Sequence, residues 1–155
     1  AQCLAERVRP TAGAETLVRT MAGWGAHSVL VSGGFTSFTG PVAAMIGFAE
    51  VHANVLEIID GKLTGALVGD IVDAAAKRSV LLAATKDKGI TMDLALAVGD
   101  GANDLPMIAA AVDGNGLGAG YHPRPQLAEA ANFSIWHNDL SALLFAQGVR
   151  RSEWL

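Results

Sequence analysis

Residues 94–112 read LALAVGDGANDLPMIAAAV, and this stretch decides the fold. It opens with Leu94–Val98, a short apolar run without alternation, which is typical of a strand covered on both faces. The apolar residues after the glycine-rich turn are spaced as on one face of a helix: Leu105, Ile108, Ala109 and Val112. A buried strand that leads through a short turn into an amphipathic helix is the repeating unit of a parallel α/β sheet.

The segments that precede this stretch also alternate between helix and strand. Helical spacing of apolar residues predicts a first helix from about Ala14, with Thr11 as its cap. The apolar run Ser28–Ser32 predicts a buried strand. It leads into a helix over roughly Phe35–Ile46, whose regular part we expect to begin at Pro41 because proline suits a first helical turn.

The remaining segments continue the alternation. Asp60-Gly61 predicts a hairpin turn within residues 48–68, and residues 70–88 read as a helix. Beyond residue 116 we expect strands around Leu117 and Phe133 and helices that start near Pro123 and Asp139. Such alternation implies parallel strands with right-handed crossovers, so we predict an α/β fold with a doubly wound, mostly parallel sheet.

Composition narrows the class of protein. With 155 residues, 51% hydrophobic and 17% charged, the chain suits one folded domain and excludes a disordered one. A net charge of −4 without any basic run argues against a nucleic-acid binder, and no apolar run is long enough to predict a membrane span. The single cysteine, Cys3, excludes an internal disulfide framework and a cysteine-based zinc site. We therefore expect a protein of the reducing cytoplasm.

Two segments place polar residues where a predicted strand ends, the edge at which such sheets bind ligands. In the first, Ser32 offers a hydroxyl, and Gly33 and Gly34 let the backbone approach an anion. This pattern favours a phosphate site. The alternative is an ordinary turn from strand to helix that Ser32 caps.

The second segment follows Val98. Asp100 comes directly after the predicted buried strand, so it should meet a cation, N–H donors or open water. Mg²⁺ suits it, because this hard ion takes one or two protein carboxylates and leaves positions for water and phosphate oxygens. Asp104 can cap the next helix, hold a lysine or orient Asp100. The alternative is a capped turn with two solvated aspartates.

Three motifs resemble those of a known family. VSGGF at residues 31–35, Lys77 on the intervening helix and GDGANDLPM at residues 99–107 are similar to motifs two, three and four of the haloacid dehalogenase superfamily phosphatases. Taken without this resemblance, Lys77 is an ordinary solvated residue on a helix face.

Longer stretches resemble one branch of that superfamily, the phosphoserine phosphatases. They are residues 9–35, 52–72 and 99–111, and the likeness covers about Arg7 to Leu144. The resemblance implies a Mg²⁺-dependent enzyme that hydrolyses the small phosphomonoester O-phosphoserine to serine and phosphate. It also implies an aspartyl-phosphate intermediate and a place as the last step of serine biosynthesis.

Residue roles follow from the matched motifs. The resemblance makes the Ser32 hydroxyl and the Gly33 N–H donors to the substrate phosphate, with Asn103 as a further phosphate contact. A carboxylate nucleophile cannot approach a phosphate dianion unless cations spread the negative charge. The remaining implied roles meet that need: Lys77 neutralises the phosphate and the attacking carboxylate, Asp100 binds Mg²⁺, and Asp104 steadies the metal site.

The family's first motif, an apolar strand followed by D-x-D-x-T, has no counterpart here, because no two aspartates are separated by a single residue. In the family this central strand carries the nucleophile and the general acid–base, and cap helices recognise the serine part. We therefore expect residues 1–9 to be the tail of the cap, 10–146 an incomplete catalytic core with its hairpin at about 54–68, and 147–155 a tail. An unpaired central edge recruits other strands, so we expect a missing N-terminal segment or a second chain to complete the sheet. The chain alone should be inactive.

Two other readings stay open at this point. One is a non-catalytic module that binds phosphate or Mg²⁺, or that a partner completes. The other is a different small-molecule phosphatase of the superfamily. A P-type ATPase domain is disfavoured, because Lys77 follows Ser32 too closely for an inserted nucleotide domain. Residues 113–115 form a small insertion relative to the family, with no assigned role.

Overall fold

The computed structural model describes residues 6–155, which form two compact units. The first unit holds the chain up to Ile71 together with Asn138–Leu155, and the second spans Val72–His137. Cys3, the basis of the compartment prediction, lies outside the described residues. The domain boundaries expected after residues 9 and 146 stay predictions.

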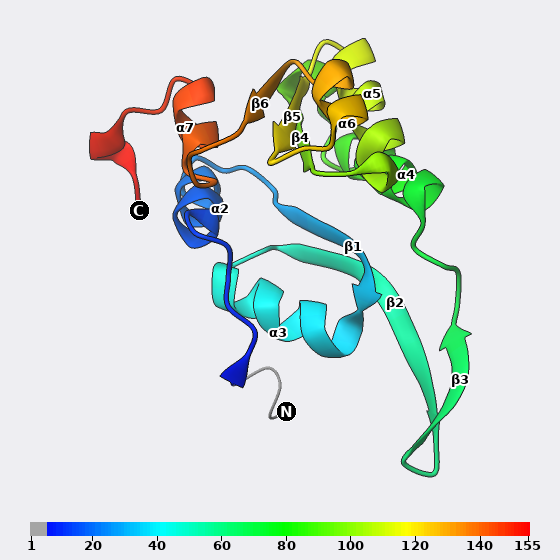
Figure 1. Ribbon diagram of the computed structural model, residues 1–155. Coiled ribbons are helices and arrows are strands. Elements are labelled where there is room, and N and C mark those ends of the chain that lie inside the picture. Colours follow the sequence, from blue (N-terminus) through cyan, green and yellow to red (C-terminus); the bar gives the residue numbers. More distant parts are fainter. Residues whose placement is uncertain (1–5) are drawn as a thin grey trace. The chain divides into compact units, whose positions relative to one another are not determined.

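A three-stranded sheet organises the first unit. Strand β1 (Val29–Phe35) pairs in parallel with β2 (Glu50–Ile59), and β2 pairs antiparallel with β3 (Lys62–Val68). Helix α3 (Thr36–Ile46) connects β1 to β2 and lies beside them, and α2 (Ala14–Gly23) contacts α3 (Figure 1). The core of this unit forms where Ala14, Val18 and Ile46 pack together.

The predicted hairpin is confirmed. Asp60 and Gly61, with φ of 51° and 75°, occupy the turn between β2 and β3. Two successive left-handed residues match the right-handed twist of the strands, which is why Asp-Gly is favoured there. Several large apolar side chains of the hairpin are exposed: Val55, Ile58, Ile59, Leu63 and Val68.

A second three-stranded sheet organises the other unit, and all its strands are parallel. Its order is β4 (Leu96–Gly99), β5 (Leu117–Tyr121) and β6 (Phe133–Ile135). The helices of this unit lie together beside the sheet (Figure 1): α4 (Ala74–Asp87), α5 (Leu105–Asp113) and α6 (Pro125–Ala130). The core is closed by Ile108 and Leu127, which have no exposed surface.

The remaining described elements are short. Helix α7 (Ala142–Ala146) follows the second unit, and three single 3₁₀ turns lie at Met92–Leu94, Ala102–Asp104 and Arg151–Glu153. No helix within residues 6–155 has the length and apolar character needed to cross a lipid bilayer.

The α/β class and the parallel pairing are confirmed. In both sheets the first strand, β1 or β4, is an edge strand, and no described strand pairs with its second edge. The expected completion of the sheet by a further strand stays a prediction.

The start of one helix and the cap of another differ from prediction. The regular part of α3 begins at Thr36 rather than at Pro41, which lies inside the helix. Proline removes only one backbone hydrogen bond there, and the Thr39 hydroxyl ties the first turn by donating to the Phe35 carbonyl at 3.3 Å.

Helix α2 is not capped by the Thr11 side chain. Its cap is Gly13, with φ of 78°, and the Ala14 N–H donates to the Thr11 carbonyl at 3.0 Å. The helix therefore begins with a backbone turn instead of the predicted hydroxyl cap. The turn needs a left-handed backbone conformation, which glycine adopts without strain.

Candidate active site

A buried ion pair joins α4 to the turn that follows β4. The Lys77 ammonium nitrogen lies 2.6 Å from Asp104 Oδ1, and the two side chains are only 8% and 7% exposed. Asp73 caps α4 by accepting from the Ala76 N–H at 2.8 Å, which sets the start of the helix that carries Lys77. Lys77 is therefore a buried, paired residue and not the solvated one that its helix position suggests.

The second carboxylate oxygen of Asp104 organises the turn itself. Its Oδ2 accepts from the Asp100 N–H at 3.0 Å and from the Gly101 N–H at 3.4 Å. Burial alone raises the pKa of Asp104, but the Lys77 hydrogen bond and these two N–H donors outweigh it and hold the pKa below its ordinary value of 3.8. Asp104 is therefore a permanent anion at neutral pH that fixes Lys77 and the backbone of Asp100.

Gly99 is required by this close packing. A Cβ at this position would lie 2.7 Å from Asp104 Cγ and 2.8 Å from Oδ2. We expect Gly99→Ala to push the Asp104 carboxylate off its partners and to lower the free energy of unfolding by about 1–3 kcal/mol. Urea unfolding followed by circular dichroism measures this loss. Gly40→Ala, at a helix position with open space around it, is the control, and equal losses in both variants would contradict the packing role.

Asp100 and Asn103 are exposed, in contrast to Asp104. The backbone of Asp100 is anchored from both sides, because its N–H reaches Asp104 and its carbonyl accepts from the Arg124 N–H at 2.8 Å. A carboxylate held at the carboxyl end of a parallel strand and open to solvent fits one ligand position of Mg²⁺, which keeps several waters. Within residues 6–155, no group of three or more His, Cys, Asp or Glu could hold a metal ion alone.

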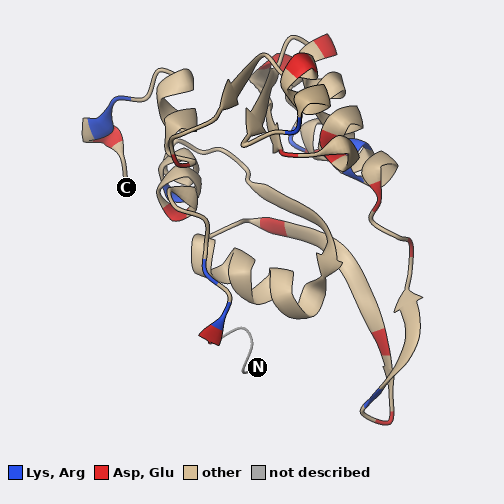
Figure 2. Cartoon of the chain, in the orientation of Figure 1, with Lys and Arg blue, Asp and Glu red and all other residues tan. Residues whose placement is uncertain are grey.

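The other predicted phosphate-binding segment belongs to the first unit. Ser32 Oγ accepts from the Gly34 N–H at 3.0 Å, and the buried Asn54 donates its side-chain N–H to the Gly33 carbonyl at 2.8 Å. The strand and helix around this turn, residues 29–46, contain no Lys, Arg, Asp or Glu (Figure 2). This segment can therefore offer a phosphate only neutral donors, a hydroxyl and backbone N–H groups.

The structure thus places the predicted residues in two groups. Lys77, Asp100 and Asp104 are linked by direct hydrogen bonds in the second unit, with Asn103 in the same turn. Ser32 and Gly33 lie in the first unit, where they terminate the regular pairing of β1 with β2. The roles assigned to these residues stay predictions.

Sequence reasoning missed a polar row on β2. The Glu50 carboxylate accepts hydrogen bonds from two imidazoles: its Oε2 lies 2.8 Å from His27 Nε2, and its Oε1 lies 2.6 Å from His52 Nε2. Asn54, two positions after His52 on the same strand, donates its side-chain N–H to the Gly33 carbonyl. The period of two along β2 puts Glu50, His52 and Asn54 on one face, and this alternation was the available signal.

Hydrogen bonds from His27 and then His52 hold the pKa of Glu50 below its ordinary value of 4.5. Glu50 therefore contributes stability above pH 4.5, and that contribution is lost as the pH falls through the lowered folded-state pKa. We expect Glu50→Gln to destabilise the chain at neutral pH by less than about 1 kcal/mol, because the group is partly exposed, and the deficit should vanish at acidic pH. Urea unfolding at several pH values tests this. Glu57→Gln on the same strand is the control, and a deficit that grows toward low pH would contradict the assignment.

The chain resembles known proteins both in sequence and in structure. The family model of haloacid dehalogenase-like hydrolases matches residues 1–109. The chain is 40% identical over 146 residues to the phosphoserine phosphatase of Streptomyces coelicolor, covering 94% of this chain and 35% of that protein. It is 41% identical over 150 residues to phosphoserine phosphatase SerB2 of Mycobacterium tuberculosis, covering 97% and 36%.

A solved structure of a substrate-bound phosphoserine phosphatase complex superimposes with a TM-score of 0.84. The two are 33% identical, and the match covers 96% of this chain and 68% of that one. The chain thus spans only about a third of the length of the two curated relatives above.

Proposed function

The chain belongs to the haloacid dehalogenase-like hydrolase family, and from this premise we propose that it supplies the core of a phosphatase that hydrolyses O-phosphoserine. The observation that carries the proposal is the buried Lys77–Asp104 pair, hydrogen-bonded to the Asp100 backbone at the carboxyl end of β4. This pair holds the Lys77 ammonium group close to the edge where parallel sheets bind ligands. The proposed location of the enzyme is the cytoplasm. The proposed reaction is the final step of serine biosynthesis.

The proposed phosphate site combines neutral donors with one cation. The Ser32 hydroxyl, the Gly33 N–H and the Asn103 amide would donate to the phosphate oxygens. Lys77 would neutralise the phosphate and the approaching carboxylate, with Asp104 fixing the position of its ammonium group. Asp104 is thus a positioning residue for both Lys77 and Asp100.

Asp100 would hold Mg²⁺ through its exposed carboxylate. When bound, the ion would withdraw charge from the phosphate and orient it for in-line attack. The backbone of Asp100 is anchored before any ion arrives, so only its side chain would have to adjust on binding.

The nucleophile would come from a D-x-D-x-T segment outside this sequence, on a strand that pairs with the open edges of β1 and β4. Its first aspartate would attack phosphorus and form an aspartyl phosphate as the serine oxygen leaves. The second would protonate that oxygen and then activate the water that releases phosphate. The chain alone is therefore proposed to be inactive.

A fusion experiment tests this proposal. The N-terminal part of the Streptomyces coelicolor relative that precedes the matched residues is joined to Ala1, and phosphate release is measured for the fusion and for the chain alone. We expect Mg²⁺-dependent release from O-phosphoserine by the fusion only. Turnover by the chain alone would overturn the need for D-x-D-x-T. Preference of the fusion for sugar phosphates would favour a different phosphatase of the family, and a folded but inactive fusion would favour a non-catalytic module.

A further inference from the structure

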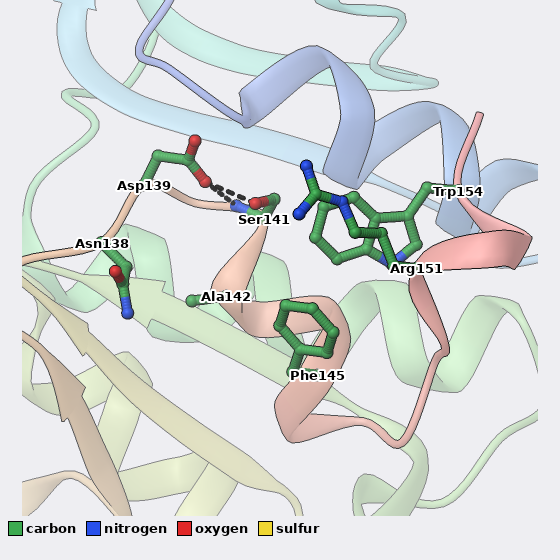
Figure 3. Close-up of a pocket in the computed structure, with 7 residues that line it drawn as sticks. All are labelled: Asn138, Asp139, Ser141, Ala142, Phe145, Arg151 and Trp154. Atoms are coloured by element: carbon green, nitrogen blue, oxygen red, sulfur yellow. Dashed lines mark hydrogen bonds between the residues drawn. The ribbon is translucent and has the colours of Figure 1, made fainter.

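A cavity close to the C-terminus is lined by charged and aromatic side chains that have no role in the proposed phosphatase site. It lies within the first unit and has a volume of about 280 Å³. Figure 3 shows its main lining residues: Asn138, Asp139, Phe145, Arg151 and Trp154. Asn138 and Asp139 precede α7, and Phe145 lies in that helix. Arg151 belongs to the 3₁₀ turn after α7, and Trp154 directly follows that turn.

One wall of the cavity is aromatic and carries a cation. The rings of Phe145 and Trp154 lie 4.9 Å apart between centroids, and the Arg151 guanidinium carbon lies 5.7 Å from the centroid of the Trp154 ring. The neighbouring Arg150 pairs with Glu153, whereas Arg151 forms no ion pair with any described carboxylate. Its charge therefore remains available to an anionic ligand.

The opposite charge is supplied by Asp139. Its Oδ1 accepts from the N–H and the hydroxyl of Ser141, while its Oδ2 has no donor among residues 6–155. Gly13 packs tightly behind this carboxylate, because a Cβ there would lie 2.6 Å from Oδ1. Asp139 is thus held in place with one oxygen available to a cationic group.

Trp154 contributes the face of its ring. Its indole Nε1 is buried, without a hydrogen-bond partner in the part of the chain that is described, so a ligand in the cavity does not reach it. The ring itself lines the cavity beside Phe145 and Arg151. A ligand in the cavity would therefore change the surroundings of this indole without bonding to its N–H group.

We propose that this cavity binds a free α-amino acid with an apolar or aromatic side chain. The α-carboxylate would pair with Arg151, and the α-ammonium group would pair with Asp139 Oδ2. The side chain would lie against Phe145 and Trp154. Only a zwitterion uses both charges, so a simple carboxylate would satisfy half of the site.

The indole resonances give a direct test with the full chain. The chain contains three tryptophans, so a ¹⁵N-labelled sample gives three indole N–H signals, and Trp154→Phe identifies the one that belongs to Trp154. L-phenylalanine is titrated beside 3-phenylpropionate, which lacks the ammonium group, and phenethylamine, which lacks the carboxylate. We expect L-phenylalanine to shift the Trp154 signal saturably and each analogue to bind at least about tenfold more weakly. An unmoved signal, or equal binding of 3-phenylpropionate, would overturn the proposal.

Substitutions separate the two charged contacts. Arg151→Gln should weaken the binding of L-phenylalanine at least about tenfold. Asp139→Asn should weaken the binding of L-phenylalanine but not that of 3-phenylpropionate. Asparagine keeps an acceptor oxygen for Ser141, and the other amide signals report whether each variant is folded. Arg19→Gln, an exposed arginine on α2 outside the cavity, is the control. An equal loss in Arg19→Gln, or no loss in Arg151→Gln, would refute the site.

Discussion

Replacing Lys77 by Met is expected to lower the free energy of unfolding of the chain at pH 7 by about 3–5 kcal/mol. Methionine approximates the volume of the lysine stem but leaves the Asp104 carboxylate, 7% exposed, without its cation. The two N–H donors from Asp100 and Gly101 remain, yet they do not neutralise a buried charge. Urea unfolding at pH 7 measures the loss.

The pH dependence distinguishes loss of charge from loss of packing. In the native chain the pKa of Asp104 lies below 3.8, so its contribution to stability is present above that pH and is lost as the pH falls through the folded-state pKa. In Lys77→Met the cation that lowers this pKa is gone, so protonation removes the unpaired charge more readily. The difference between the two proteins should therefore shrink toward acidic pH.

Two variants control the Lys77 measurement. Lys86→Met changes an exposed lysine of the same helix and should alter stability by less than about 0.5 kcal/mol. Lys77→Met combined with Asp104→Asn should recover part of the loss, because no unpaired charge remains. A pH-independent deficit without recovery in the double variant would show that packing of the lysine stem, and not the ion pair, stabilises this turn.

Replacing Asp100 by Asn should reduce Mg²⁺-dependent phosphate release by the fusion described above by roughly a thousandfold. A metal ion supplies several kcal/mol of charge stabilisation, and each 1.4 kcal/mol corresponds to about tenfold in rate. The side chain is exposed, so the substitution should leave the free energy of unfolding within about 0.5 kcal/mol of the parent.

Metal binding can be measured by NMR with the chain alone, without the fusion. Mn²⁺, a paramagnetic substitute for Mg²⁺, should broaden the backbone amide signals of residues 99–104 in the parent chain and not in Asp100→Asn. Asp93→Asn, an exposed aspartate in the turn before β4, is the matched control and should leave the broadening unchanged. Broadening that persists in Asp100→Asn would place the ion on other ligands.

Local patterns were sufficient to predict most elements. The apolar run that became β4, the helical spacing of α5 and the Asp60-Gly61 turn each depend on short-range preferences that tertiary packing did not override. The cap of α2 and the start of α3 were wrong for the opposite reason. A left-handed Gly13 packed behind Asp139, and a helical turn that tolerates Pro41, depend on neighbours that the local pattern does not contain.

The sequence by itself determined the α/β class, the turn after β4 and the positions of its acidic residues, because these follow from periodicity and from residue types a few positions apart. It also identified Lys77, but only through resemblance to a family. Tertiary structure alone decided that Lys77 and Asp104 are buried partners and that Glu50 joins His27 to His52. The physical reason is that charge pairing and desolvation depend on distances between residues remote in sequence, which no local pattern encodes.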